Sequence, residues 1–72
     1  MNQIERRTYT TEQKFAIINS PKFSTLGYAM DHALENNISL PVLQEPKLGI
    51  FTVPAGEDEY LTLTEQLGYR VA

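Results

Sequence analysis

Few side chains in this chain of 72 residues are suited to chemistry. The sequence has no cysteine and one histidine, His32, which excludes thiol nucleophiles and zinc sites built on sulfur. Its serines are Ser20, Ser24 and Ser39, and none lies in the strand-to-helix turn of a nucleophile motif. Ser20 precedes a proline and Ser24 precedes an expected helix, where a serine hydroxyl commonly bonds the local backbone. We therefore predict that the protein is not an enzyme.

A second group of polar residues has spacings that favour ligand binding on a helix. Asp31, His32 and Glu35 share the polar face of an expected helix, because three- and four-residue spacings return to one side. His32 and Glu35 could both ligate a metal ion, but two ligands do not close a site and no second histidine is present. We interpret the group as a solvated face, and we expect no metal and no cofactor.

The densest charge in the sequence is the acidic run from Glu57 to Glu59, with Tyr60 directly after it. The net charge of −3 weighs against nucleic acid, whereas carboxylates beside an amphipathic ring favour a basic protein surface. An alternative interpretation is that these acids only keep a loop soluble. Two faces are predicted to bind a partner, and their residues are Glu57, Asp58, Glu59 and Tyr60 for the first, and Tyr28, Asp31, His32 and Glu35 for the second.

Arginines near both termini suggest a different class of function. Arg6, Arg7 and Arg70 would meet if the first and last segments pair in one sheet, and their planar donor groups suit an anionic ligand. The four glycines are too far apart for a phosphate-binding loop. The alternative function is therefore binding of a small anion or nucleotide in a cavity between protomers.

A first helix is expected to begin at Thr10, because Thr10 and Gln13 can cap each other's backbone amides. The helix should run for about two turns and end at Asn19-Ser20-Pro21, since proline cannot continue it. Phe15, Ile18 and one of Ala16 and Ile17 are predicted to be its buried residues.

A second helix is expected after Ser24 or Thr25, either of which can cap it. Its apolar residues follow helical spacing and are predicted to face the core, namely Leu26, Ala29, Met30, Ala33 and Leu34. Asn36-Asn37 should end the helix in a left-handed turn, with Ile38 folding back onto the apolar face.

The second half of the chain predicts β structure. Residues 48–53 are apolar and β-branched and are predicted to form a strand. Residues 57–67 fit either the returning arm of a hairpin, with Leu61 and Leu63 facing the core, or a helix ended by Gly68. We favour the hairpin. Residues 68–72 should form a turn and a short strand, and residues 1–8 a flexible arm that becomes a strand near Tyr9.

Together these elements predict one small α+β domain over residues 1–72, with two short N-terminal helices packed on a small antiparallel β-sheet or hairpin. A domain of this size buries little surface, so self-association is a further expectation. The absence of cysteine suits the cytoplasm, and no apolar run approaches the length of a membrane-spanning helix.

The predicted function is a non-catalytic protein-interaction module, an inhibitor or regulator that binds a basic surface. In size and charge alone the chain is similar to small acidic accessory proteins, including phage-encoded inhibitors. Its element order also resembles a winged helix-turn-helix, which gives DNA binding as a second alternative. The acids near the expected wing and on the second helix would repel phosphates, which disfavours that alternative.

Overall fold

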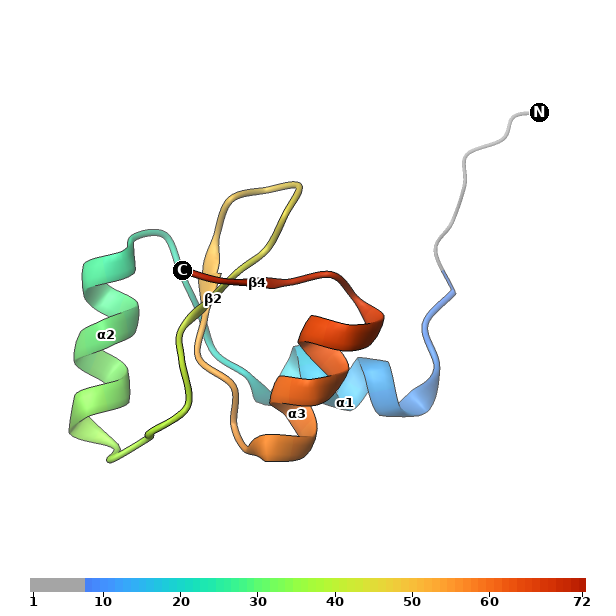
Figure 1. Cartoon of the computed structure of the whole chain (residues 1–72), viewed down its shortest axis with the longest axis horizontal. Helices are drawn as coiled ribbons and strands as arrows, with labels where there is room; N and C mark the ends of the chain where they lie inside the picture. Colours follow the sequence, from blue (N-terminus) through green and yellow to red (C-terminus); the bar gives the residue numbers. More distant parts are fainter. Residues whose placement is uncertain (1–7) are drawn as a thin grey trace.

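The computed structural model describes residues 8–72, and it is an α+β domain with a four-stranded antiparallel sheet (Figure 1). Its elements in chain order are α1 (Thr11–Asn19), β1 (Lys22–Phe23), α2 (Leu26–Glu35), β2 (Leu43–Gln44), β3 (Phe51–Thr52), α3 (Glu57–Leu61), the π-helical turn η1 (Thr62–Gln66) and β4 (Arg70–Val71). The predicted fold class is confirmed, since two N-terminal helices pack on a small antiparallel sheet. The third helical segment, α3–η1, was not the favoured expectation.

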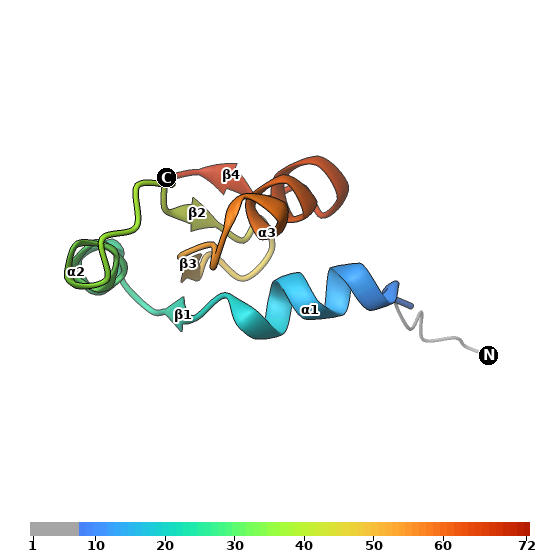
Figure 2. The ribbon, with the colours of Figure 1, turned by 90° about the horizontal axis from the view of Figure 1, so that it is seen from below.

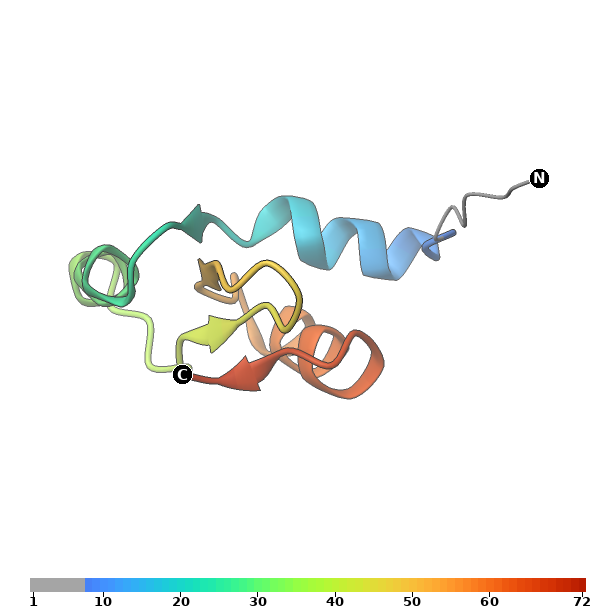
Figure 3. The ribbon, with the colours of Figure 1, turned by 90° about the horizontal axis from the view of Figure 1, so that it is seen from above.

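The sheet has the strand order β1-β3-β2-β4, which Figures 2 and 3 show from opposite sides. Each strand is two residues long, and prolines lie within two residues of β1, β2 and β3. Because proline cannot donate to the ladder, it limits how far these strands extend. The expected strand over residues 48–53 is therefore reduced to Phe51–Thr52. No strand forms at Thr8–Thr10.

Helices cover the sheet from two sides, and each side has its own apolar core. The cross-strand partners Leu43 and Thr52 share one face, and Phe23 and Phe51 share the other. The first core consists of Ala16, Leu43 and Leu63, between the sheet and the helices α1 and α3–η1. The second core consists of Ala29, Ala33 and Val53, where α2 meets the sheet. The sheet thus lies between α2 and the pair formed by α1 and α3 (Figures 1 and 2).

Helix α1 begins and ends as the sequence predicts. Thr10 Oγ1 accepts from the Gln13 amide at 3.1 Å, and Gln13 Oε1 accepts from the Thr10 amide at 3.0 Å. The helix ends at Ser20, which is buried and whose hydroxyl accepts from the Ala55 amide at 3.3 Å. That contact gives Ser20 a structural role that ties α1 to the segment before α3.

The predicted burial of α1 is largely wrong. Ala16 is buried, but Phe15 and Ile18 are 58% and 74% exposed. The reason is that α3–η1 packs closely along the Ala16 side of α1, where only a small side chain fits between the two helices. Phe15 is thereby left at the surface beside α3.

Helix α2 also has the predicted ends. Thr25 caps it, Asn37 adopts a left-handed φ of 54°, and the Ile38 amide donates to the Ala33 carbonyl at 2.9 Å. Ile38 packs against the second core as expected. The predicted burial is only half correct, because Ala29 and Ala33 are buried whereas the larger members of the apolar row are exposed.

Residues 57–66 are helical, so the favoured hairpin is wrong and the helix alternative is correct. Acidic residues in the first turn stabilise the α3 N-terminus, and Gly68 ends the segment with a left-handed φ of 77°. Tyr60, Leu63 and Leu67 share one face and pack in the first core. Leu61, expected to face the core of a hairpin, is 42% exposed.

Lys22 links β1 to the end of α1. Its Nζ donates to the carbonyls of Ile17 and Ser20, which have no helical amide to bond. Partial burial lowers the pKa of Lys22 below its usual value. The ammonium is therefore a C-terminal cap of α1 that fixes the angle between the helix and the sheet.

Candidate functional site

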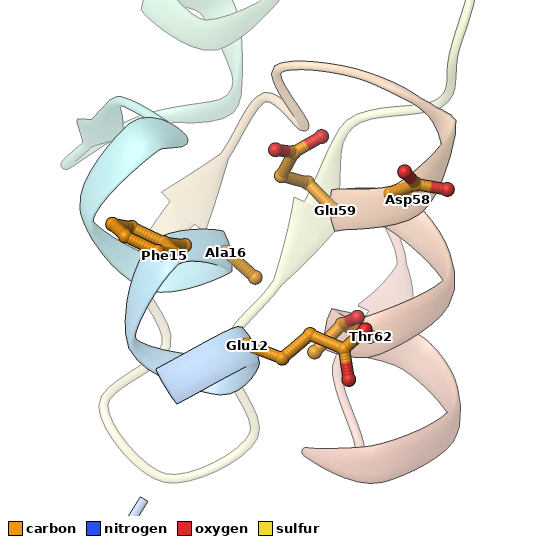
Figure 4. A pocket seen from close by; sticks show the side chains of 6 residues that line it. All are labelled: Glu12, Phe15, Ala16, Asp58, Glu59 and Thr62. Atoms are coloured by element: carbon orange, nitrogen blue, oxygen red, sulfur yellow. The ribbon is translucent and has the colours of Figure 1, made fainter. Parts of the chain in front are cut away.

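A pocket with a volume of about 180 Å³ lies between α1 and α3–η1. Its lining combines three carboxylates, an exposed aromatic ring and two small side chains. The residues are Glu12, Phe15, Ala16, Asp58, Glu59 and Thr62. In Figure 4 the Glu12 and Glu59 side chains lie between the two helices, whereas Asp58 lies on the side of α3 farther from α1. We call this feature the acidic pocket.

Contacts between α1 and η1 join the two walls of the acidic pocket. Gln13 Nε2 donates to Gln66 Oε1 at 2.8 Å, which joins the first turn of α1 to η1. Ala16 and Leu63 meet in the first core directly beneath the pocket. Because both helices are anchored in this way, the spacing of Glu12 and Glu59 is set by the fold.

Gly56 leaves space for one of the carboxylates. An added Cβ on Gly56 would lie 3.0 Å from Glu59 Oε1, so the Glu59 side chain folds back over the glycine at the start of α3. Glu57, the first acid of the run, does not line the pocket. The structure thus divides the predicted cluster, bringing Asp58 and Glu59 together with Glu12 and leaving Glu57 outside.

The carboxylates of the acidic pocket form no ion pair or hydrogen bond within residues 8–72. Unpaired acids beside the exposed Phe15 ring can accept from an ammonium or guanidinium group, while the ring contacts its aliphatic stem and favours the cation electrostatically. No cluster of three or more metal-ligating side chains forms within that span. The arrangement suits an organic cation with an apolar stem, which is the chemistry of lysine and arginine.

The sequence contained a signal for the α1 wall of the pocket that our interpretation did not use. Glu12, Phe15 and Ala16 follow the spacing of one helix face. No family model, curated protein or solved structure matches this chain.

Tyr60, which was predicted for the first binding face, is half-buried beside the first core. Its ring packs against Ala16, Leu43 and Leu63 in the first core. Its position on α3 requires this, because Tyr60 shares a helix face with Leu63 and Leu67. Tyr60 therefore packs on the core that also contains Ala16 of the pocket lining.

The second predicted face lies on α2, across the sheet from the acidic pocket. Asp31 and Glu35 are exposed, and Tyr28 is 64% exposed, as expected for a surface residue. His32 is half-buried with its ring centroid 5.2 Å from that of Phe23. His32 therefore contributes mainly to packing, whereas the carboxylates of Asp31 and Glu35 face solvent.

The arginine hypothesis is only partly within the described residues, because Arg6 and Arg7 lie outside them. Arg70 is exposed on β4 and lines a second pocket of about 280 Å³ with Gln44, Glu45, Pro46 and Gly49. The Glu45 carboxylate accepts from the Lys47 and Leu48 amides and adds a negative charge to this pocket. Such a lining disfavours a small anion.

Tyr69 gives the fold a specific response to alkaline pH. Burial, together with the charges of Glu45 and Tyr9, raises the pKa of Tyr69 above 10.0, its ordinary value. Above that pH the unfolded chain releases the phenolic proton before the folded chain does, so the free energy of unfolding falls as pH rises. We expect this fall to be smaller in Tyr69→Phe, measured by urea unfolding between about pH 9 and 11. Equal slopes for both proteins would contradict the assignment.

Proposed function

We propose that this protein is a non-catalytic protein-interaction module that binds a basic surface on a partner and thereby inhibits or regulates it. The acidic pocket receives a lysine or arginine side chain of that partner. The observation that supports this proposal is that the carboxylates of Glu12, Asp58 and Glu59 line the same pocket as the exposed Phe15 side chain, without a cation of the described residues to pair them.

A protein partner suits this surface better than a nucleic acid. The α3 N-terminus carries acidic residues throughout its first turn, which would repel phosphates. The hairpin wing expected near residues 57–59 does not form, because residues 57–66 are helical. Helices α1 and α2 lie on opposite sides of the sheet (Figure 1), whereas a helix-turn-helix packs its two helices together.

The composition supports a cytoplasmic location for the module, since a chain without cysteine suits a reducing compartment. Within residues 8–72, no helix is long and apolar enough to cross a membrane.

The acidic pocket can be tested with a small cationic probe. We expect N-acetyl-arginine amide to shift the backbone amide resonances of residues 12–16 and 58–62 in ¹⁵N-labelled protein, with a dissociation constant of roughly a millimolar. N-acetyl-glutamine amide, which is neutral, is expected to leave them unchanged. Salt should weaken the binding because the pocket is open to solvent.

Matched variants separate the pocket from general acidity. Asp58→Asn/Glu59→Gln is expected to weaken probe binding about tenfold, since both acids line the pocket. Glu57→Gln/Glu65→Gln removes the same charge from exposed positions outside it and is expected to change binding less than about twofold. Shifts in other segments, or equal effects of the two double variants, would refute the pocket as the binding site.

A further inference from the structure

Helix α2 buries its small apolar residues and exposes its large ones. Ala29 and Ala33 are 0% and 8% exposed. Leu26, Met30 and Leu34 are 38%, 50% and 75% exposed, and they form one continuous row because they are spaced four residues apart. We call this row the α2 ridge. A helix whose only partner is the sheet beneath it would turn its leucines inward, so the α2 ridge lacks a partner within residues 8–72.

A row of carboxylates follows the α2 ridge on the side away from the sheet. Asp31 and Glu35 each come one position after a ridge residue, and both are exposed. Neither forms an ion pair or a hydrogen bond within residues 8–72. The helix contains no lysine or arginine. The exposed surface of α2 is therefore an apolar row bordered along one side by negative charge.

We propose that the α2 ridge docks into an apolar groove of a partner protein whose rim carries lysine or arginine residues opposite Asp31 and Glu35. Amphipathic helices bind such grooves through anchors at these spacings. Burial of the ridge supplies most of the affinity, and the charges fix the orientation of the helix in the groove. The sheet lies between α2 and the helices α1 and α3 (Figures 1 and 3), so this surface does not depend on the proposed function.

Charge argues against a second copy of the chain as the occupant. If two ridges pack antiparallel about a two-fold axis at Met30, each flank of one helix faces the same flank of the other. Asp31 then lies opposite Asp31 of the second copy, where like charges repel. A parallel arrangement avoids this contact but still provides no cation, since neither copy of α2 carries a lysine or arginine.

Gly27 leaves room beside the α2 ridge for a closely approaching partner. An added Cβ at Gly27 would meet no atom within 4 Å, so packing within residues 8–72 does not require the glycine. Glycine nevertheless costs a helix up to about 1 kcal/mol relative to alanine. Gly27 follows Leu26 by one position and so lies on the same flank as the carboxylates. Close approach of the groove rim to the backbone explains its presence.

Photo-methionine, incorporated at Met30 in cells that express the protein, tests the proposal with little change to the ridge. We expect Met30 to cross-link to an apolar segment of another protein that has lysine or arginine nearby. Leu34→Asp should lower the cross-linking yield about 30-fold, as expected for an anchor residue. Leu48→Asp is the matched control, because Leu48 lies outside α2, in the turn between β2 and β3, and is 76% exposed, as Leu34 is 75% exposed. Leu34→Gln replaces the aspartate variant if circular dichroism shows that the latter is unfolded.

Each alternative occupant gives a distinct result. Cross-links to a second copy of the chain or to lipid would overturn the proposal. A cross-linking yield no higher than that of the Met30→Leu protein would also overturn it. So would an equal loss in Leu34→Asp and Leu48→Asp. The Met30 cross-link reports on the α2 ridge, whereas the shifts that N-acetyl-arginine amide causes at residues 12–16 and 58–62 report on the acidic pocket, so failure of one surface is distinguishable from failure of the other.

Discussion

Replacing Leu43 with alanine is expected to unfold most of the protein at ordinary temperature. Leu43 is 0% exposed and lies in β2, where it joins α1 and η1 in the first core. Removing a fully buried leucine side chain costs about 2–5 kcal/mol, because a cavity remains where the side chain was. A single core in a domain of this size rarely supplies more than about 3–5 kcal/mol. Thermal unfolding followed by circular dichroism should show a loss of most of the transition.

Leu48→Ala is the control for that prediction. Leu48 is 76% exposed, so its truncation should change the free energy of unfolding by less than about 0.5 kcal/mol. A Leu43→Ala protein that unfolds as cooperatively and at the same temperature as Leu48→Ala would contradict the assignment of the first core.

Reversing the pocket charges is expected to have the largest effect on partner binding. Asp58→Lys/Glu59→Lys places two cations where the partner's lysine or arginine should lie, so we expect about a 100-fold loss of affinity. The dependence of affinity on salt should also weaken, because the favourable charge contacts are lost. Both effects can be measured by titration calorimetry with the purified partner at low and high salt.

The comparison variant is Glu57→Lys/Glu65→Lys, which changes the net charge by the same amount at exposed positions outside the acidic pocket. Lysine in the first turn of α3 opposes the helix dipole in both variants, so each should lose about 0.3–1 kcal/mol of stability. Affinity should fall far less in this comparison variant. Equal losses would mean that overall charge, rather than the acidic pocket, governs binding.

Local signals in the sequence predicted the ends of the first two helices correctly. The capping box at Thr10 and Gln13, the Thr25 cap and the left-handed Asn37 all form as expected. These features depend only on residues within one or two turns, so neighbouring sequence is sufficient to specify them.

Burial could not be predicted in the same way, because it depends on which elements meet across the fold. Phe15 and Met30 have the spacing of core residues, yet the close packing of their helices selects the adjacent alanines instead. The alternation at residues 60–64 favoured a strand, but the first core accepts Tyr60, Leu63 and Leu67 from a helix. Tertiary packing therefore overrides short periodic patterns in this half of the chain.

The candidate site was predicted in part. Asp58 and Glu59 were identified from the local charge density, and both line the acidic pocket. Glu12 is distant in sequence and joins them only because α1 and α3 lie side by side. Tyr60 was assigned to the same face because the sequence did not distinguish a helix from a hairpin over these residues. Only the helix turns Tyr60 toward the first core.

The most direct test of the central claim is quantitative affinity capture from the source cells, with the wild-type protein and the two charge-reversal variants compared in parallel. We expect the wild type and Glu57→Lys/Glu65→Lys to retain one protein with a basic surface in about equimolar amount, and Asp58→Lys/Glu59→Lys to lose it. Equal retention by all three proteins, or no protein retained above background, would contradict the assignment of the acidic pocket as a partner-binding site.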